Sequence, residues 1–329
     1  MLPEPVPKMS TGLARRELLW CAAAGLPRLA AEPGLPRTRT AAVRCEVDVP
    51  GSPVSLWLPV PKSDACQTID ELRISGLDRH EIHDGPVDSN RYLFAKVPGS
   101  RTVGMEFRLA RTERLPGTSS PVAGQPSPTC CTGPDRLVPL DARIRGWAQD
   151  VVQQARARTD LEKARAIYEH VVSTVKYDKS GQGWGRGDIY YACDTRRGNC
   201  SDFHAIFIGY ARAVGIPAKF VIGLPLPPNR GSGAIAGYHC WAEFFTKDTG
   251  WVPVDASEAA KDPARRKYFF GALDEDRVEL SQGRDLVLTP RQTGAPLNFF
   301  VYPYAESAGQ RVDLSFRYTY QDLPPPASR

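Results

Sequence analysis

The sequence predicts an α+β protein in which a small all-β domain precedes helices that pack on an antiparallel sheet. Two observations predict this class. Residues 38–115 contain short runs of alternating apolar and polar residues between turn-forming residues, which is typical of strands. From residue 137 onward, apolar residues first repeat at helical spacing and then alternate again. Because the helices come before the strands instead of alternating with them, the second sheet is expected to be antiparallel.

Alternation in the first region is clearest in four runs. These predicted strands are residues 42–49, 54–58, 91–95 and 103–109. Residues 116–136 are rich in Pro, Gly, Ser and Thr, so we interpret them as a linker or long loop. A second domain is then predicted for residues 137–305, and a terminal strand and tail for residues 306–329.

The second domain opens with three predicted helices. The first has apolar residues at helical spacing over 144–155, and the second starts at the capping box formed by Thr159 and Glu162. The third covers about residues 200–214 and ends at Gly215. Strands are predicted after it, at residues 218–224, 238–245, 251–255, 299–302 and 314–318.

Composition excludes several classes of protein. The chain has 329 residues, of which 42% are hydrophobic and 24% charged, as in an ordinary globular protein. Its 42 basic and 37 acidic residues are scattered, so no nucleic-acid partner is expected. No apolar run approaches the roughly 18 residues that cross a bilayer, so no integral membrane segment is expected in the mature chain.

Residues 1–35 have the layout of an export signal. The pair Arg15-Arg16 precedes a short apolar stretch, and small residues follow at Ala30-Ala31. The twin arginines favour the bacterial twin-arginine route, which would deliver the protein to the periplasm or cell envelope. The alternative is an N-terminal arm that is disordered or lies on the protein surface.

Eight cysteines are many for a cytosolic enzyme. If the signal is removed and Cys200 stays free, six remain, which permits three disulfides without defining their pairing. No Cys-x-x-Cys pair occurs, so no structural zinc site is expected. The Gly-rich loop at residues 181–188 lacks the Lys-Ser/Thr ending of a phosphate loop, so no nucleotide cofactor is expected either.

Cys200 is a candidate nucleophile because of its place at the start of a predicted helix. Asn199 is a favourable N-cap, which puts Cys200 in the first turn and Asp202 at the third position. Free backbone N–H groups and the helix dipole favour a negative charge there, and the thiolate is the attacking form of cysteine. The alternative is a buried or disulfide-bonded cysteine.

His239 is the candidate base. A hairpin joins its strand to residues 251–255, and Asp255 would lie opposite His239 if the turn centres on Lys247. With the turn centred on Asp248, Asp255 would lie diagonally across on the same face. A slip of one residue would move Asp255 to the other face. Cys200, His239 and Asp255 could thus supply the nucleophile, base and orienting carboxylate of a thiol triad.

His204 is the rival base, since it follows Cys200 by one helical turn. No carboxylate partner for His204 is evident in the sequence. We therefore expect it to pack in the wall of the site.

Three blocks containing these residues resemble the signature blocks of the transglutaminase-like superfamily. They are Arg197-Gly-Asn-Cys-Ser-Asp-Phe-His204 with Ala213–Ala218 after it, Tyr238-His-Cys-Trp-Ala-Glu243, and Gly250-Trp-Val-Pro-Val-Asp255. Their order and their Cys–His and His–Asp spacings of 39 and 16 residues also fit. The similarity covers residues 137–305, and the preceding β region resembles the companion domain of bacterial members.

The resemblance implies a papain-like core and acyl transfer from a peptide or side-chain amide of a protein substrate. Water as the acceptor gives a hydrolase, which we favour; the alternatives are a cross-linking transglutaminase and a non-catalytic binding or scaffold protein. The backbone N–H of Cys200 is the natural first oxyanion donor. Candidates for the second donor stay open: Gln182, Trp184, Tyr190 and Tyr191.

Overall fold

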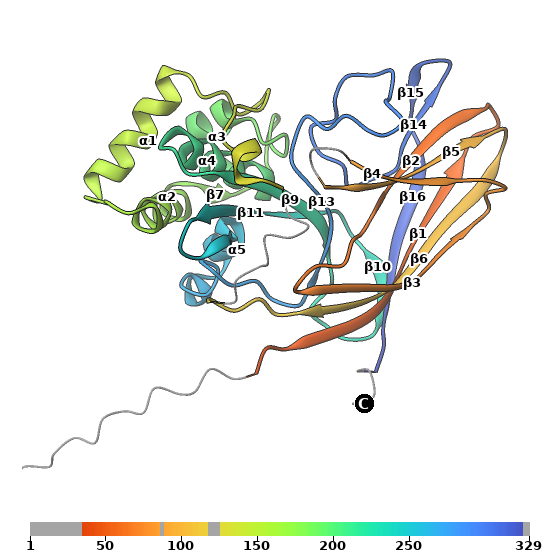
Figure 1. Cartoon of the computed structure of the whole chain (residues 1–329), viewed down its shortest axis with the longest axis horizontal. Helices are drawn as coiled ribbons and strands as arrows, with labels where there is room; N and C mark the ends of the chain where they lie inside the picture. Colours follow the sequence, from red (N-terminus) through yellow and green to blue (C-terminus); the bar gives the residue numbers. More distant parts are fainter. Residues whose placement is uncertain (1–34, 86–88, 118–125, 325–329) are drawn as a thin grey trace, which may run out of the picture. The chain divides into compact units, whose positions relative to one another are not determined.

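Figure 1 shows the computed structural model of the chain, which describes residues 35–85, 89–117 and 126–324. The predicted export signal, residues 1–35, lies outside the described residues except for its last residue, and residues 118–125 of the predicted linker lie outside them as well. Contacts group residues 36–329 into one compact unit. Within the described ranges, no helix has both the length and the apolar character needed to cross a membrane.

Two five-stranded sheets form the β part of this unit. The first has the order β10 (Ser232–Ile235), β16 (Ser315–Asp322), β1 (Thr38–Val49), β6 (Arg101–Thr112) and β3 (Gln67–Ser75). The second has the order β15 (Gln310–Val312), β14 (Tyr304–Ser307), β2 (Val54–Val60), β5 (Arg91–Val97) and β4 (Glu81–Asp84). Neighbouring strands are antiparallel throughout both sheets.

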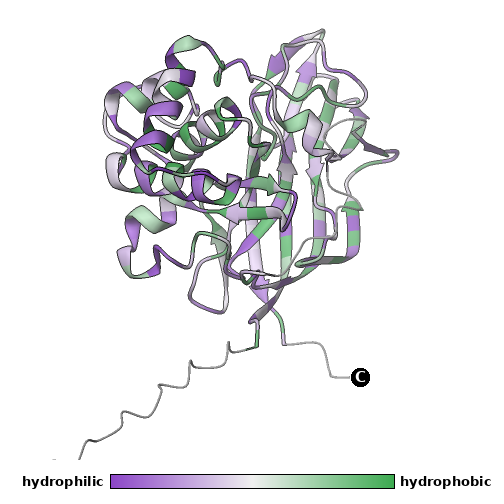
Figure 2. Cartoon of the chain, turned by 60° about the vertical axis from the view of Figure 1, so that its left-hand side comes forward, coloured by the Kyte–Doolittle hydropathy of each residue, from purple (hydrophilic) through white to green (hydrophobic). Residues whose placement is uncertain are grey.

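A third antiparallel sheet belongs to the helical part. Its order is β12 (Gly250–Val254), β11 (His239–Thr246), β9 (Ala218–Pro225) and β13 (Arg277–Gln282). Strands β7 (Lys176–Tyr177) and β8 (Arg197–Gly198) form a separate two-stranded parallel sheet. Hydrophobic and hydrophilic residues form alternating bands along many strands in Figure 2, as expected for strands with one face in the core.

The helices gather on one side of the unit in Figure 1. They are α1 (Ala142–Gln154), α2 (Asp160–Thr174), α3 (Ile189–Thr195), α4 (Cys200–Ala213) and α5 (Ala256–Lys261), with single 3-10 turns at η1 (Pro128–Cys131) and η2 (Pro263–Arg265). Every residue of α4 is buried, because α4 packs against β11 and β9 and also contacts α1, α2, α3 and α5. This helix is therefore the fixed centre from which the candidate site is built.

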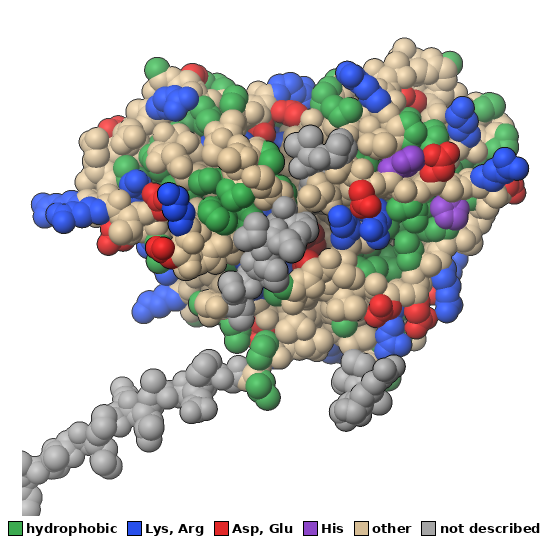
Figure 3. Space-filling view, viewed as in Figure 1, with side chains coloured by type: hydrophobic (Ala, Val, Ile, Leu, Met, Phe, Trp, Pro, Cys, Tyr) green, Lys and Arg blue, Asp and Glu red, His purple; other side chains and the backbone are tan. Residues whose placement is uncertain are grey.

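The predicted α+β class is confirmed, and so are the capping box of α2 and the start of α4. The structure adds that both ends of the chain build the β part, because β16 pairs with β1 along eight residues. The predicted domain boundaries stay predictions. On the face visible in Figure 3, basic side chains are interspersed with acidic ones.

The predicted strand at residues 299–302 is wrong. These residues lie in the segment that connects β13 to β14, and side chains donate hydrogen bonds to the carbonyl groups of Phe300 and Val301. Ser281 Oγ donates to the carbonyl of Phe300, and Tyr318 Oη donates to that of Val301 at 3.1 Å. Phe300 and Val301 are buried and Phe299 and Tyr302 are half-buried, so this apolar run resembles a strand in the sequence.

Candidate functional site

Cys200 occupies the first turn of α4 and is 1% exposed. Asn199 caps the helix, since its side-chain oxygen accepts the N–H of Ser201 at 2.9 Å. Asp202 completes the capping box by accepting the N–H of Asn199 at 2.9 Å. These local bonds explain why the helix begins where it does, and they hold the thiol at the positive end of the helix dipole.

Asp202 also anchors the Gly-rich loop to the start of α4. Its carboxylate accepts the N–H of Gly185 at 2.7 Å and that of Gly187 at 3.0 Å. Gly198 has a φ of 157°, and a Cβ there would lie 2.2 Å from Asp202 Oδ2. A side chain at this position would therefore displace Asp202 and loosen both the loop and the helix start.

His239 and Asp255 meet across the β11–β12 hairpin. Thr246 pairs with Gly250, so the turn centres on Asp248, and Asp255 lies diagonally across from His239. Nε2 of His239 is 2.7 Å from Oδ2 of Asp255. Of the two registers left open by the sequence, the structure has the diagonal one.

Asp255 is fully buried and held by four further groups. Its Oδ1 accepts the Ser257 hydroxyl at 2.9 Å and the Glu258 N–H at 3.0 Å, which makes Asp255 the N-cap of α5. Its Oδ2 accepts a second bond, from Arg277 Nη1 at 3.0 Å, and its backbone N–H donates to Phe269. The carboxylate therefore has little freedom to turn away from His239.

Sequence reasoning missed Arg277, which is 2% exposed on β13. Besides Asp255, its guanidinium binds Asp274 Oδ1 through Nε at 3.1 Å and Nη2 at 2.9 Å, and it lies 5.2 Å from the Trp241 ring centre. A single arginine in an alternating strand gives no signal in the sequence. Only the pairing of β13 with β9 brings it to Asp255.

All three predicted residues have pKa values shifted from their ordinary values. Burial alone raises the pKa of the Cys200 thiol, but hydrogen bonds from Cys240 and His239 and the charge of His239 bring the net pKa well below its ordinary value. Burial lowers the pKa of His239, yet the charge and hydrogen bond of Asp255 outweigh it and raise this pKa to about 10. The charges of His239 and Arg277 likewise overcome burial and hold the pKa of Asp255 well below its usual range.

His204 is fully buried and engaged on both ring nitrogens. Its Nε2 accepts the N–H of Ala256 at 3.1 Å, so the proton sits on Nδ1, which donates to the Cys200 carbonyl at 2.8 Å. Burial lowers the pKa of this imidazole. No carboxylate partner of His204 is evident in the sequence, but in the structure Asp255 Oδ1 lies 3.8 Å from its Nε2.

Two further side chains around the nucleophile were missed. Tyr238 Oη contacts the start of α4, at 2.9 Å from Asn199 Nδ2 and 3.0 Å from Ser201 Oγ, and donates to the Gly185 carbonyl at 3.1 Å. Cys240 Sγ lies 3.7 Å from both Ser201 Oγ and His204 Nδ1. Both residues flank His239 in the sequence, and this adjacency was the available signal.

The four candidates for the second oxyanion donor lie in different surroundings. The Tyr190 hydroxyl donates to Asp141 at the start of α1, and Trp184 Nε1 donates to the Gly181 carbonyl at 3.2 Å. The buried Tyr191 hydroxyl has no partner among the described residues. Gln182 is exposed on the Gly-rich loop. Tyr190 is thus committed to a neighbouring helix, whereas Gln182 and Trp184 lie on the loop that Asp202 anchors beside Cys200.

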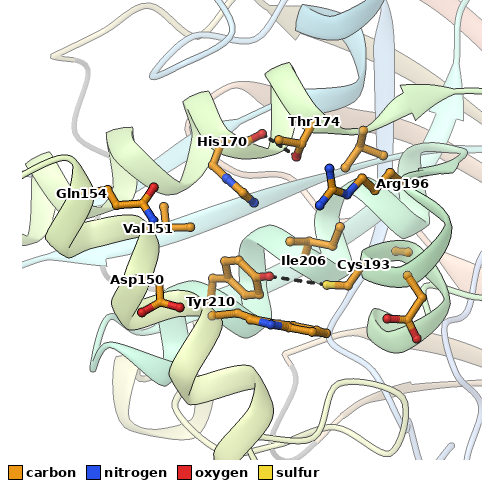
Figure 4. Close-up of a pocket in the computed structure, with 13 residues that line it drawn as sticks. Asp150, Val151, Gln154, His170, Thr174, Cys193, Arg196, Ile206 and Tyr210 are labelled. Atoms are coloured by element: carbon orange, nitrogen blue, oxygen red, sulfur yellow. Dashed lines mark hydrogen bonds between the residues drawn. The ribbon is translucent and has the colours of Figure 1, made fainter.

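A cavity of about 370 Å³ lies elsewhere, among α1, α2, α3 and α4 (Figure 4). His170 and Tyr210 face each other in it with ring centres 6.0 Å apart, and Cys193 Sγ is 3.6 Å from the Tyr210 hydroxyl. None of Cys200, His239 and Asp255 lines this cavity. All seven cysteines in the described residues are free, and no cluster of potential metal ligands occurs among those residues.

Comparison with known families agrees with this geometry. Residues 145–256 match the transglutaminase-like superfamily, so this part of the chain is a transglutaminase-like domain. The matched segment includes Cys200, His239 and Asp255.

Individual relatives are more distant. An uncharacterized protein of Haemophilus influenzae is 32% identical over 196 residues, which are 49% of this chain and 53% of that protein. The chain thus spans about half the length of that relative.

The crystal structure of a candidate cysteine protease from Cytophaga hutchinsonii has a TM-score of 0.57 at 15% identity, covering 89% of this chain and 93% of that one. At this identity the likeness shows the fold. The periplasmic domain of TgpA from Pseudomonas aeruginosa gives a TM-score of 0.39 at 19% identity, over 70% of this chain and 74% of that domain.

Proposed function

We propose that the chain is a thiol-dependent acyl-transfer enzyme that hydrolyses peptide or side-chain amides. Cys200 is the nucleophile, His239 the acid and base, and Asp255 the orienting carboxylate. The observation that supports this most is the bond between His239 Nε2 and Asp255 Oδ2. Because Asp255 occupies Nε2, the other ring nitrogen is left to exchange a proton with the Cys200 sulfur.

The chemistry proceeds in two steps. In the first, the Cys200 thiolate attacks the amide carbon, and the His239 imidazolium gives its proton to the leaving nitrogen, so that a thioester forms and an amine departs. In the second, neutral His239 takes a proton from water, and the resulting hydroxide attacks the thioester. The products are a carboxylic acid and the regenerated thiolate–imidazolium pair.

The first turn of α4 supplies an oxyanion donor. The N–H groups of Asn199, Ser201, Asp202 and Phe203 all have acceptors, which are the Asp202 carboxylate, the Asn199 side chain and the Asn199 carbonyl. Among the described residues, these acceptors leave the N–H of Cys200 itself available. This group would stabilise the negative oxygen of the tetrahedral intermediate.

Hydrolysis is favoured over cross-linking because water is present at roughly 55 M, and an amine competes only where the site orients it. The test offers glutamine-containing peptides together with a labelled primary amine and follows both products by mass spectrometry. Free acid or cleaved peptide should dominate, and Cys200→Ala should abolish it. Amine incorporation that exceeds hydrolysis at millimolar amine would reassign the chain to cross-linking. Absence of both products would favour a non-catalytic binding protein.

We also propose that the chain is exported, with a mature form that begins near Glu32. The twin arginines and the short apolar segment after them support this. Mass spectrometry of the protein from its native host tests it. An intact N-terminus there would refute the proposal.

A further inference from the structure

One side of the candidate site carries two lysine side chains that lie over aromatic rings. Lys261 Nζ is 4.4 Å from the ring centre of Tyr177, and Lys179 Nζ is 5.8 Å from the same ring and 5.9 Å from that of Trp184. A ring face attracts an ammonium group electrostatically, yet leaves its N–H donors free to bind an anion. Both ammonium groups therefore lie near the Tyr177 ring, and we call these two lysines together with Tyr177 and Trp184 the wall.

This wall adjoins the nucleophile. Tyr177 of β7 pairs with Gly198 of β8, two residues before Cys200, and the N–H of Asp178 donates to the Gly198 carbonyl at 3.0 Å. The pKa of the Tyr177 phenol is raised, first by burial and then by the negative charge of the Cys200 thiolate. Tyr177 therefore lies close enough to the Cys200 sulfur for the thiolate charge to raise its pKa.

The wall also continues to the base. Glu258 Oε1 lies 3.9 Å from His239 Nε2 and forms an ion pair with Lys261. Tyr177, which carries Lys261 on its ring, then connects this pair to Lys179. Contacts thus run from the imidazole, through Glu258 and Lys261, to the lysine beside the Gly-rich loop.

Lys261 and Lys179 differ in their charged partners. Glu258 neutralises Lys261, and the neighbouring carboxylate of Asp178 accepts the Ser180 N–H at 2.8 Å. Within the described part of the chain, Lys179 has ring contacts but no carboxylate partner. Its exposed ammonium group is therefore available to a ligand that enters from solvent.

We propose that Lys179, supported by Lys261, forms a subsite that binds a carboxylate of the substrate beside the scissile amide. This inference rests on the proposed function, and it narrows the substrate class to peptides with a negative group near the reacting bond. An acidic side chain and a free C-terminal carboxylate would both supply that chemistry. A salt-dependent preference for anions follows, because exposed charge pairs are screened by ions.

A pair of small reagents tests the subsite without a peptide substrate. Iodoacetate carries a carboxylate and iodoacetamide does not, so the ratio of their rates at Cys200 measures attraction of the anion. Lys179→Ala should lower this ratio about two- to five-fold, the range expected for loss of one exposed ion pair, and 0.5 M salt should lower it in the wild type. Lys96→Ala, which removes an exposed lysine from β5 in the β part, is the matched control. An equal ratio in both variants would refute the subsite.

The iodoacetamide rate alone keeps the two claims separate. If Cys200 reacts with it no faster than the other thiols, the proposed function fails. If Cys200 reacts quickly but the ratio of the two alkylation rates is the same in Lys179→Ala as in the wild type, only the proposed subsite is refuted.

Two peptide pairs then identify the source of the carboxylate. One pair exchanges Glu for Gln beside the scissile amide, and the other exchanges a C-terminal acid for a C-terminal amide. The true source should show a lower KM for the acid form in the wild type and lose that advantage in Lys179→Ala. A KM that is equal within both pairs would overturn the proposal.

Discussion

Arg277 Nη1 lies 3.0 Å from Asp255 Oδ2, the same oxygen that is 2.7 Å from His239 Nε2. Asp255 is fully buried, so its charge requires a compensating cation that water cannot replace. Arg277 provides one at the same carboxylate oxygen and is itself balanced by Asp274. The arginine therefore keeps Asp255 ionised and pointed at His239.

Replacing Arg277 by Met should reduce both stability and rate. Loss of one partner of a buried ion pair typically costs about 3–5 kcal/mol, because the carboxylates of Asp255 and Asp274 remain buried. We expect a lower melting temperature and a lower kcat, with KM nearly unchanged. Arg277→Lys is the matched control, since it keeps the charge but not the fork of three bonds, and it should recover part of both losses. A kcat equal to wild type in folded Arg277→Met would contradict this role.

The two buried histidines should respond differently to mutation. His239→Ala removes the proton donor and acceptor of the proposed mechanism, so the rate should fall by about 10²–10⁴-fold. His204→Ala removes two structural hydrogen bonds, to the Cys200 carbonyl and the Ala256 N–H, and should mainly lower the melting temperature. Rates normalised to the folded fraction make the comparison. Loss of activity in His204→Ala but not in His239→Ala would overturn the triad.

Tyr238→Phe should lower the activity of the site without abolishing it. The change removes only the hydroxyl that joins Asn199, Ser201 and the Gly185 carbonyl. Because the Gly-rich loop then loses one of its attachments to α4, we expect a lower kcat and faster amide hydrogen exchange in residues 181–188. Tyr318→Phe, which loses a hydroxyl bond to Val301 in the β part, controls for the general cost of such a change. Equal exchange in both variants would contradict the anchoring role.

The pH profile of kcat/KM follows from the lowered pKa of Cys200 and the raised pKa of His239. The reactive pair needs thiolate, which forms as pH rises through the lowered pKa of Cys200, and imidazolium, which is lost as pH rises through the raised pKa of His239, about 10. Activity should therefore rise on the acid side, stay level across neutral pH and fall in alkali. Cys240→Ala removes a hydrogen bond that lowers the Cys200 pKa, so its acid limb should move to higher pH. An acid limb at the ordinary thiol pKa of about 8.5 in the wild type would contradict the shift.

The parts of the site predictable from sequence are those with local causes. Asn199 and Asp202 define the start of α4 by bonds within four residues, and a tight hairpin constrains His239 and Asp255 to neighbouring positions. Arg277 was not predictable, because only the ladder between β13 and β9 brings it to Asp255. The same holds for β16, whose partner β1 lies more than 260 residues earlier in the chain. Residues 299–302 were not predictable, because an apolar run can be buried or half-buried in a connecting segment without strand pairing.

The central claim is that Cys200 is an activated thiolate, and competitive alkylation tests it most directly. The protein is treated with limiting iodoacetamide at pH 6, and the label on each of its cysteines is measured by mass spectrometry. Cys45 and Cys131 serve as internal references, since burial raises the pKa of the Cys45 thiol to about 12 and that of Cys131 to about 11. The account predicts that Cys200 is labelled first, and that His239→Ala removes this preference while the other thiols keep their rates. Labelling of Cys200 at or below the rate of the other thiols in the wild type would contradict it.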